Sequence, residues 1–295
     1  MIKKILFNIW YVLKNGFQLT LVFLSIVGTY FTLINPDISE IGIKMRIFIL
    51  TLCFVIAYII YLCVIFICRK VIVYEEDQKK IAVQYGDFIK IIDKYEKSQD
   101  KAIFVIPVNR CFDTIVDDVV VEKGSVHGQF VKYCTDNIYS LSVLNDMIDS
   151  SLKIKKCEEL EKEEKDKGKM KRYPVGTVAK IESVKGNVFY LLAFTTFKKV
   201  GDKITVDESI NMYNYLECLQ SMVDYYNLDG RNLPIYIPTI GCGLSRLHIS
   251  IDNSVKQLLS IWNLNHDVIR DCVNIVIYNK NFWNVNIMKY KKEGK

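Results

Sequence analysis

The hydrophobic positions of this 295-residue chain form two long uninterrupted runs near the N terminus and a series of short runs after residue 70. The long runs cover residues 16–34 and 47–68, and neither contains a charged residue. A helix rises about 1.5 Å per residue, so roughly 20 residues cross a hydrocarbon core of about 30 Å. We therefore predict two transmembrane helices, at about 16–34 and 47–68, in a membrane anchor that covers residues 1–70.

The alternative for the first run is a cleaved signal peptide. The run is longer than the apolar stretch of most signal peptides, and no small-residue cleavage site follows it. Residues 2–13 are also apolar with aromatic residues, which suits either a helix lying at the membrane interface or a longer first span.

The flanking charges predict the orientation. Basic residues stand at the outer ends of both runs, whereas the connection 35–46 mixes acidic and basic residues. Segments rich in Lys and Arg are retained in the cytoplasm. We expect a multi-pass protein of the cell inner membrane whose N terminus and soluble domain, residues 71–295, are cytoplasmic.

After residue 70, β-branched runs alternate with stretches of helical periodicity, which is typical of an α/β domain. The Gly186-Asn187 dipeptide predicts a hairpin turn, so the sheet is expected to be mixed. The expected strands are 71–74, 80–84, 102–107, 176–184, 188–196, 233–237 and 272–278, and the expected helices are 88–97, 128–133, 140–152, 207–226 and 252–262.

A dense run of Lys and Glu covers residues 150–172. Its charges are of mixed sign and include i, i+4 pairs such as Glu158 with Lys162. This pattern predicts a solvated helical insertion. A lid over a site is the sharper alternative.

Charge and cysteine content exclude two classes of function. Residues 1–70 hold seven Lys or Arg against two acidic residues, a net +5 of the formal +6, which leaves +1 for the rest. A nearly neutral domain lacks the basic footprint of a nucleic-acid-binding protein. The nine cysteines include no CxxC pair, and a zinc site from Cys111, His127 and Cys134 would lack a fourth ligand, so buried thiols are the simpler interpretation.

The segment 235–246, IYIPTIGCGLSR, carries most of the candidate chemistry. An apolar strand leads into a loop with two glycines and then into a helix. Glycines let backbone N–H groups converge on an anion, and a helix N terminus favours negative charge. No Walker sequence is present, and a tight turn without a ligand remains the alternative. The candidate residues are Thr239, Ile240, Gly241, Cys242, Gly243, Leu244 and Ser245.

Two further candidates follow early strands, at the sheet edge where ligands of open α/β sheets bind. Asp87, in Gly86-Asp87-Phe88, could accept a hydrogen bond from an adenine amino group or simply cap the next helix. Asn109, in Ile106-Pro107-Val108-Asn109, could bond ribose hydroxyls or serve as a turn residue.

Together these three segments resemble the macro domain family, whose fold recognises ADP-ribose. The resemblance covers about residues 80–278 and implies a macro-domain-like mixed sheet flanked by helices. It implies that Asp87 and Phe88 belong to the adenine end, Asn109 to the distal ribose and residues 239–245 to the diphosphate loop.

One departure from that family concerns residues 110–129, which replace the usual poly-glycine stretch. The change suggests a distal pocket shaped for something other than plain ADP-ribose conjugates. The candidates to line it are Phe112, Asp113, Asp117, Ser125 and His127.

Two membrane helices before a divergent macro domain resemble the ThsA-type effectors of bacterial Thoeris antiphage systems, in their transmembrane-macro variant. The resemblance implies that a TIR-domain partner converts NAD into an ADP-ribose-type signal, such as histidine-ADP-ribose. The macro domain binds the signal, and the membrane helices then assemble as a homo-oligomer and damage the lipid bilayer. An acidic distal loop could pair with the amine of such a ligand. No cofactor besides this ligand, no nucleic acid and no catalysis are expected.

Two alternatives stay open. The chain could be a membrane-tethered hydrolase of ADP-ribosylated targets, with Asp113 or Asp117 as the base near Asn109. It could also be a non-catalytic scaffold whose ligand site is vestigial.

Overall fold

The computed structural model describes residues 67–200, 203–206, 211–243, 249–282 and 284–292, with scattered positions between 17 and 63. The chain divides into two units, Met1–Arg69 with Asn281–Lys289 and Lys70–Lys280 with Tyr290–Lys295. Much of the two predicted spans lies outside the described residues. Within the described part of the chain, no helix is both long enough and apolar enough to cross a membrane.

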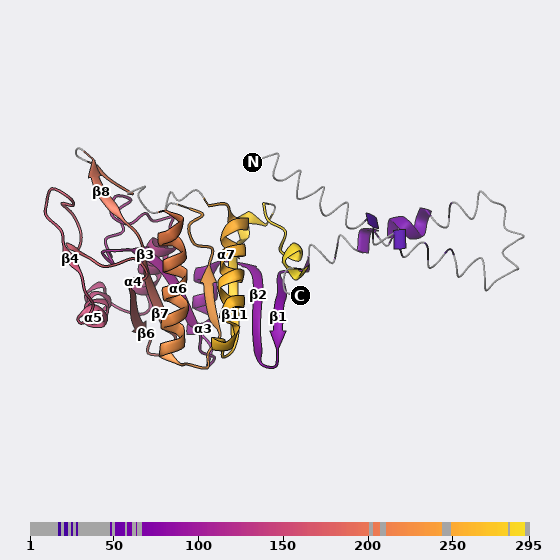
Figure 1. Cartoon of the computed structure of the whole chain (residues 1–295), viewed down its shortest axis with the longest axis horizontal. Coiled ribbons are helices and arrows are strands. Elements are labelled where there is room, and N and C mark those ends of the chain that lie inside the picture. Colours follow the sequence, from indigo (N-terminus) through magenta and orange to yellow (C-terminus); the bar gives the residue numbers. More distant parts are fainter. Residues whose placement is uncertain are drawn as a thin grey trace, which may run out of the picture. The chain divides into compact units, whose positions relative to one another are not determined.

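The second unit is built on a seven-stranded sheet (Figure 1). The five inner strands run parallel to one another, and the two edge strands are antiparallel to their neighbours. The predicted mixed sheet is therefore confirmed, and the carboxyl ends of five strands share one edge. In spatial order the strands are β1 (Lys70–Glu76), β2 (Lys79–Gly86), β11 (Cys272–Tyr278), β10 (Ile235–Pro238), β3 (Ile103–Asn109), β7 (Val188–Thr195) and β6 (Val178–Glu182).

Helices cover both faces of this sheet (Figure 1). One layer consists of α3 (Phe88–Glu96), α4 (Val126–Asn137) and α5 (Leu141–Leu152), and the other of α6 (Met212–Asp229) and α7 (Ile251–Leu264). Strands buried on both faces read as continuous apolar runs. This explains why every residue from Ile103 to Ile106 has no exposed surface.

Aromatic rings join the strands to the first helical layer. Phe104 of β3 lies 6.1 Å from Phe88 of α3, 5.8 Å from Phe189 of β7 and 5.5 Å from Tyr236 of β10, measured between ring centroids. Its side chain is completely buried. Aromatic pairs at such distances add to the gain from burial itself. The first part of β3 is thus held in place from three sides.

Side chains at the N-cap positions set the starts of the helices. Asp87, Ser125, Ser140, Asn211 and Ser250 each accept a backbone N–H from three residues further on. Each cap satisfies one of the donors that a helix leaves unpaired at its first turn. The helix expected from 207 begins instead at Met212, because Asn211 forms a capping box with Asn214.

The segment between β7 and α6 holds a hairpin that the hydrophobic pattern did not reveal. Strand β8 (Phe197–Val200) pairs with β9 (Lys203–Val206) in antiparallel register. Both strands are short and rich in lysine, so the alternation of apolar and polar residues that marks a strand is weak. The Gly201-Asp202 dipeptide between them lacks the Asn-Gly or Asp-Gly order of the strongest turn signal.

The predicted helical insertion is wrong. Residues 153–172, called the strap below, contain turns and a two-residue strand pair, β4 (Glu158–Glu159) with β5 (Lys171–Arg172). Glu158 bonds Arg172 at 3.0 and 2.8 Å rather than pairing with Lys162. An i, i+4 charge pair stabilises a helix by only about 0.2–0.5 kcal/mol, so more distant partners easily outweigh it. Short 3₁₀ turns complete the fold at His266–Val268, Asn279–Asn281 and Ile287–Lys292.

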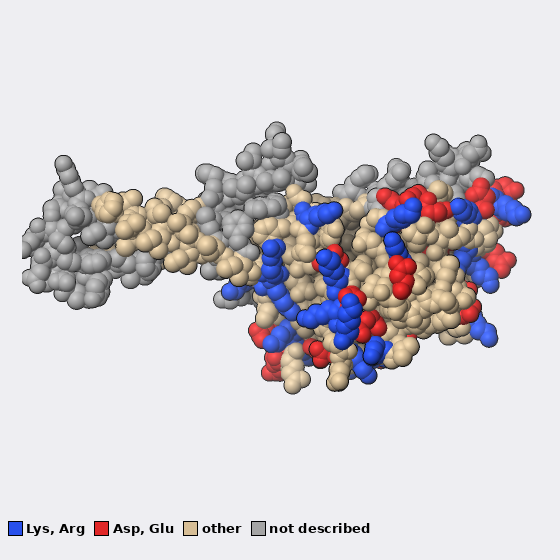
Figure 2. All heavy atoms as spheres, turned by 180° about the vertical axis from the view of Figure 1, so that it is seen from behind, with Lys and Arg blue, Asp and Glu red and all other residues tan. Residues whose placement is uncertain are grey.

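Charged side chains of both signs share the surface. On the face seen in Figure 2, Asp and Glu side chains lie among those of Lys and Arg. Exposed pairs such as Lys97 with Asp93 and Arg231 with Glu182, both at 2.7 Å, hold some of these charges together. Exposed pairs contribute little to stability. Their interspersion fits the small net charge of residues 71–295.

Two glycines near the start of α4 offer a test of the packing. A Cβ on Gly128 would lie 2.3 Å from the backbone oxygen of Glu122, whereas a Cβ on Gly124 would meet nothing within 4 Å. We expect Gly128→Ala to lower the free energy of unfolding by about 1–3 kcal/mol through overpacking. Gly124→Ala should change it by less than about 0.5 kcal/mol. Urea denaturation measures both, and equal stability of the two variants would contradict the packing described.

Candidate functional site

Two of the three predicted segments end neighbouring strands, and the third lies two strands away on the same edge. Asn109 is the last residue of β3, and the glycine loop follows Pro238 at the end of the adjacent β10. Asp87 follows β2, which one strand, β11, separates from β10. Segments far apart in the sequence, from Asp87 to the glycine loop at Thr239, therefore share the carboxyl edge, where open α/β sheets bind ligands.

Asp87 stands at the β2 end of this edge and begins α3. Its Oδ1 accepts the backbone N–H of Lys90 at 3.3 Å, so Asp87 caps this helix. The residue is half-buried. Phe88 is only 6% exposed and packs into the core. The cap leaves a carboxylate at the edge, and its predicted contact with a ligand stays a prediction.

The glycine loop is fastened to α7 by a serine. The hydroxyl of the buried Ser254 accepts the N–H of Ile240 at 3.0 Å and donates to the carbonyl of Ile240 at 2.8 Å. Tyr215 reaches the same carbonyl at 3.4 Å. These bonds hold the first part of the loop close to the N terminus of a helix, as an anion site requires. Sequence reasoning missed Ser254, although its place in the first turn of the helix was a usable signal.

Gly241 has a backbone conformation that favours glycine. Its φ of +82° lies in the left-handed region, which costs other residues about 1–2 kcal/mol. Next to it, burial raises the pKa of the Cys242 thiol, which contacts the carbonyl of Ile240 at 3.6 Å. Thr239 is half-buried, Gly243 is exposed, and Leu244 and Ser245 lie outside the described residues.

Asn109 is the most informative residue of the site. It is only 2% exposed, and its Oδ1 accepts the backbone N–H groups of Cys111 at 3.1 Å and Asp113 at 3.2 Å. Its Nδ2 is buried and has no hydrogen-bond partner in the structure. A buried donor without a partner costs about 1–3 kcal/mol. The acceptor of this amide therefore serves the following turn, and its donor is left for another group.

The turn after Asn109 is tight and strained. The N–H of Phe112 donates to the carbonyl of Asn109 at 2.9 Å, and Phe112 has a φ of +53° without being a glycine. The Phe112 ring is buried edge-on against Tyr173 at 5.4 Å. Such backbone conformations persist only where the surroundings enforce them. Here the strap and its continuation through Tyr173 supply that constraint.

Both acidic candidates of the distal segment are already engaged. The buried Asp113 carboxylate bonds the Lys165 ammonium at 2.6 Å and the N–H of Lys169 at 2.6 Å. Asp117 pairs with Lys167 and accepts the N–H groups of Val119 and Val120. Partial burial opposes the change, but these bonds lower the pKa of Asp117 to about 2. Neither carboxylate is a free partner for a ligand amine in this structure.

Ser125 and His127 lie at the start of α4. Ser125 is the N-cap, accepting the N–H of Gly128 at 2.9 Å. Burial lowers the pKa of His127 to about 4. A hydrogen bond to the backbone of Asp113 acts in the opposite direction and raises this pKa. The structure thus brings His127 beside the turn that follows Asn109, as a neutral imidazole. Among the described residues, no group of three His, Cys, Asp or Glu side chains is arranged to hold a metal.

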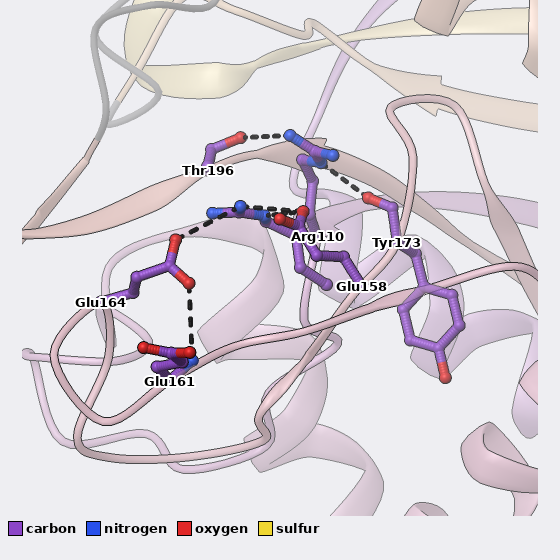
Figure 3. Close-up of polar contacts among 7 residues, drawn as sticks. Arg110, Glu158, Glu161, Glu164, Tyr173 and Thr196 are labelled. Atoms are coloured by element: carbon purple, nitrogen blue, oxygen red, sulfur yellow. Dashed lines mark hydrogen bonds and ion pairs between the residues drawn. The ribbon is translucent and has the colours of Figure 1, made fainter.

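Arg110 is a polar residue of this edge that sequence reasoning missed. Its Nε donates to the carbonyl of Tyr173 at 2.6 Å and its Nη1 to the hydroxyl of Thr196 at 3.2 Å (Figure 3). Thr196 follows β7, so the guanidinium joins the ends of two neighbouring strands. Its position directly after Asn109 was the only sequence signal. Figure 3 also shows Glu158 and Glu164 of the strap, which bond Arg172.

Comparison with known proteins assigns a family. The model described as "Thoeris protein ThsA, Macro domain" matches residues 81–278. The chain belongs to this family. Thoeris protein ThsA of Bacillus amyloliquefaciens (strain Y2) is 24% identical over 279 residues, which cover 91% of this chain and 87% of that protein.

Two solved macrodomain structures are less similar in sequence to this chain than that relative is. A mutant macrodomain of Oceanobacillus iheyensis has a TM-score of 0.46 at 11% identity and covers 77% of this chain and 96% of its own. The same macrodomain with ADP has a TM-score of 0.41 at 10% identity, with coverages of 76% and 94%. Both scores lie below 0.5, so the family match carries the assignment. That match confirms the predicted resemblance for the macro domain.

The burial of His127 predicts a pH dependence. Its pKa of about 4 in the folded state lies below the ordinary value of 6.5. As pH falls from 6.5 to 4, the unfolded chain takes up a proton that the folded chain does not, so stability falls by up to roughly 3 kcal/mol. Denaturation midpoints measured across this pH range should fall as the pH falls, which gives a slope of stability against pH. His127→Gln should flatten it, and an unchanged slope in that variant would refute the assignment.

Proposed function

We propose that this protein is an effector of a Thoeris antiphage system and that its macro domain is the sensor. A TIR-domain partner would produce an ADP-ribose-type signal, such as histidine-ADP-ribose. Binding of the signal would drive assembly of the N-terminal hydrophobic segments and disruption of the cell inner membrane. In this proposal the partner acts through the signal, and the N terminus and macro domain lie in the cytoplasm.

The unpaired Nδ2 of Asn109 is the observation that carries the sensor function. It is buried at the carboxyl edge of β3, next to the strand that leads into the glycine loop. Buried donors normally have partners, so one without a partner favours a missing acceptor such as a ribose hydroxyl. Family membership and the loop's attachment to a helix N terminus support the same ligand.

The membrane step rests on the sequence. Two runs of 19 and 22 uncharged residues lie at 16–34 and 47–68. Because neither contains Asp, Glu, Lys, Arg or His, a single chain cannot line a polar pore, and several chains must assemble. Ligand can drive this assembly only if it binds the assembled state more tightly than the free chain.

The hydrolase alternative gains no support from the site. Its candidate bases are Asp113, which is buried against Lys165, and Asp117, which is paired with Lys167. A general base must reach the water it activates, and both carboxylates are occupied. A sensor that leaves its ligand intact fits this arrangement better.

Calorimetric titration of the full-length protein with ADP-ribose and with histidine-ADP-ribose tests the proposal, followed by analysis of the recovered ligand. We expect saturable binding and intact ligand. Breakdown of the ligand would favour a hydrolase. The absence of binding to either compound would leave a scaffold, with the family and fold unchanged.

A pair of glycine variants separates ligand contact from general strain. Gly241 and Gly186 both have left-handed φ values, +82° and +84°, but Gly186 lies in the hairpin turn between β6 and β7, away from the carboxyl edge. Alanine at either position should cost about 1–2 kcal/mol of stability. Only Gly241→Ala should also weaken ADP-ribose binding, by about tenfold or more if a comparable cost falls on the complex. Equal affinities of the two variants in calorimetry would remove the loop from the site.

A further inference from the structure

The strap is attached to the domain in an unusual way. Of its residues 153–172, only Leu160 and Lys165 are buried, at 8% and 1% exposure. Its other contacts are largely charge pairs near the surface, such as Lys167 with Asp117 and Lys169 with Asp149. Exposed pairs hold a segment weakly, and segments with little apolar burial open most easily. The strap therefore depends on the site where Lys165 is buried.

Lys165 is buried against a single carboxylate. Its ammonium donates to Asp113 at 2.6 Å and to the carbonyl of Lys169 at 2.8 Å, and both charged side chains are at most 1% exposed. A Cβ on Gly168 would lie only 2.2 Å from Asp113 Oδ1, so the strap closes tightly around this carboxylate. A buried charge that loses its partner is strongly destabilising. The pair can exist only while the strap is closed.

The same aspartate is connected to the ligand-facing amide. The backbone N–H of Asp113 donates to Asn109 Oδ1, as does that of Cys111. These two bonds fix which way the Asn109 amide points and leave its Nδ2 as the unpaired donor. Phe112, between them, is held at a strained φ of +53°. Releasing Asp113 from Lys165 would free this turn to relax and the amide to turn.

We propose that Lys165 is a positioning residue for Asn109 and that closure of the strap is coupled to ligand binding at the Nδ2 of Asn109. Coupling between two sites is reciprocal. A ligand that needs this amide orientation stabilises the closed strap, and the closed strap raises affinity for the ligand. The ligand half of this inference rests on the proposed function, whereas the positioning half does not.

Hydrogen–deuterium exchange of the full-length protein, read by mass spectrometry, tests the inference with a matched pair of variants. Lys165→Met removes the buried ammonium, and Lys167→Met removes an exposed one from the same strap. The amides of Cys111 and Asp113 report directly on the Asn109 acceptor. Their exchange should accelerate at least about fivefold in Lys165→Met, the lower end of typical couplings, and change less than about twofold in Lys167→Met.

Calorimetry with ADP-ribose on the same proteins gives the second readout. Affinity should fall at least about fivefold in Lys165→Met and stay within about twofold of the wild type in Lys167→Met. In the wild type, saturating ADP-ribose should slow exchange of the strap, and this comparison needs no variant. It therefore decides the coupling even if Lys165→Met does not fold.

Three outcomes would overturn the inference. If a folded Lys165→Met variant exchanges at residues 109–113 at the wild-type rate, Lys165 holds the strap closed but does not position Asn109. Unchanged affinity in that variant, or strap exchange that ignores ADP-ribose, would remove the coupling. If the wild type binds neither ADP-ribose nor histidine-ADP-ribose, the proposed function fails, while exchange in the two variants still tests the positioning.

Discussion

Burial of both faces of the inner strands, nearly complete in β3 and β7, is the constraint on which the rest of this structure depends. With α3, α4 and α5 on one side and α6 and α7 on the other, β3 and β7 have little surface for polar chemistry except at their ends. Phe104 packs against rings from three other elements and anchors the first part of β3. Asn109 is the last residue of this buried strand and begins the turn that follows, so it lies at a rigid edge.

The buried polar groups described at this edge have bonding partners, with one exception. A polar group removed from water is costly unless it is bonded, and a charge is costlier still. Ser254 pairs with both backbone groups of Ile240, and Lys165 pairs with Asp113. The Nδ2 of Asn109 is the exception within the described edge. An exception among satisfied neighbours is what a site prepared for a ligand should show.

The distal segment that follows Asn109 is the segment that the strap contacts. Residues 110–121 carry two non-glycine residues with positive φ, Phe112 and Asp118, and the strap pairs with Asp113 and Asp117 in the same stretch. Strain of this kind needs support from elsewhere in the chain. The charged insertion thus supports the turn after Asn109.

The order of the elements was readable from the sequence, because the forces that specify it are local. Apolar runs marked the buried strands, Gly186-Asn187 marked the hairpin, and capping residues marked helix starts such as Asp87. The candidates at the strand ends followed from the rule that parallel strands present their carboxyl ends together. These features depend on neighbours a few residues apart. The resemblance to the macro domain family rested on the same segments.

Only the tertiary structure decided how the strap folds and what the Asn109 amide does. Lys165 and Asp113 are 52 residues apart, and nothing in the local charge pattern distinguishes Lys165 from the lysines around it. The sequence therefore predicted a helix where long-range pairing wins. Likewise, Asn109 was recognisable as a polar residue at a strand end, but the assignment of its oxygen to the turn and its nitrogen to a missing partner needed three dimensions. Sequence thus determined where the chemistry stands, and long-range charge pairing and burial determined which atoms remain available for it.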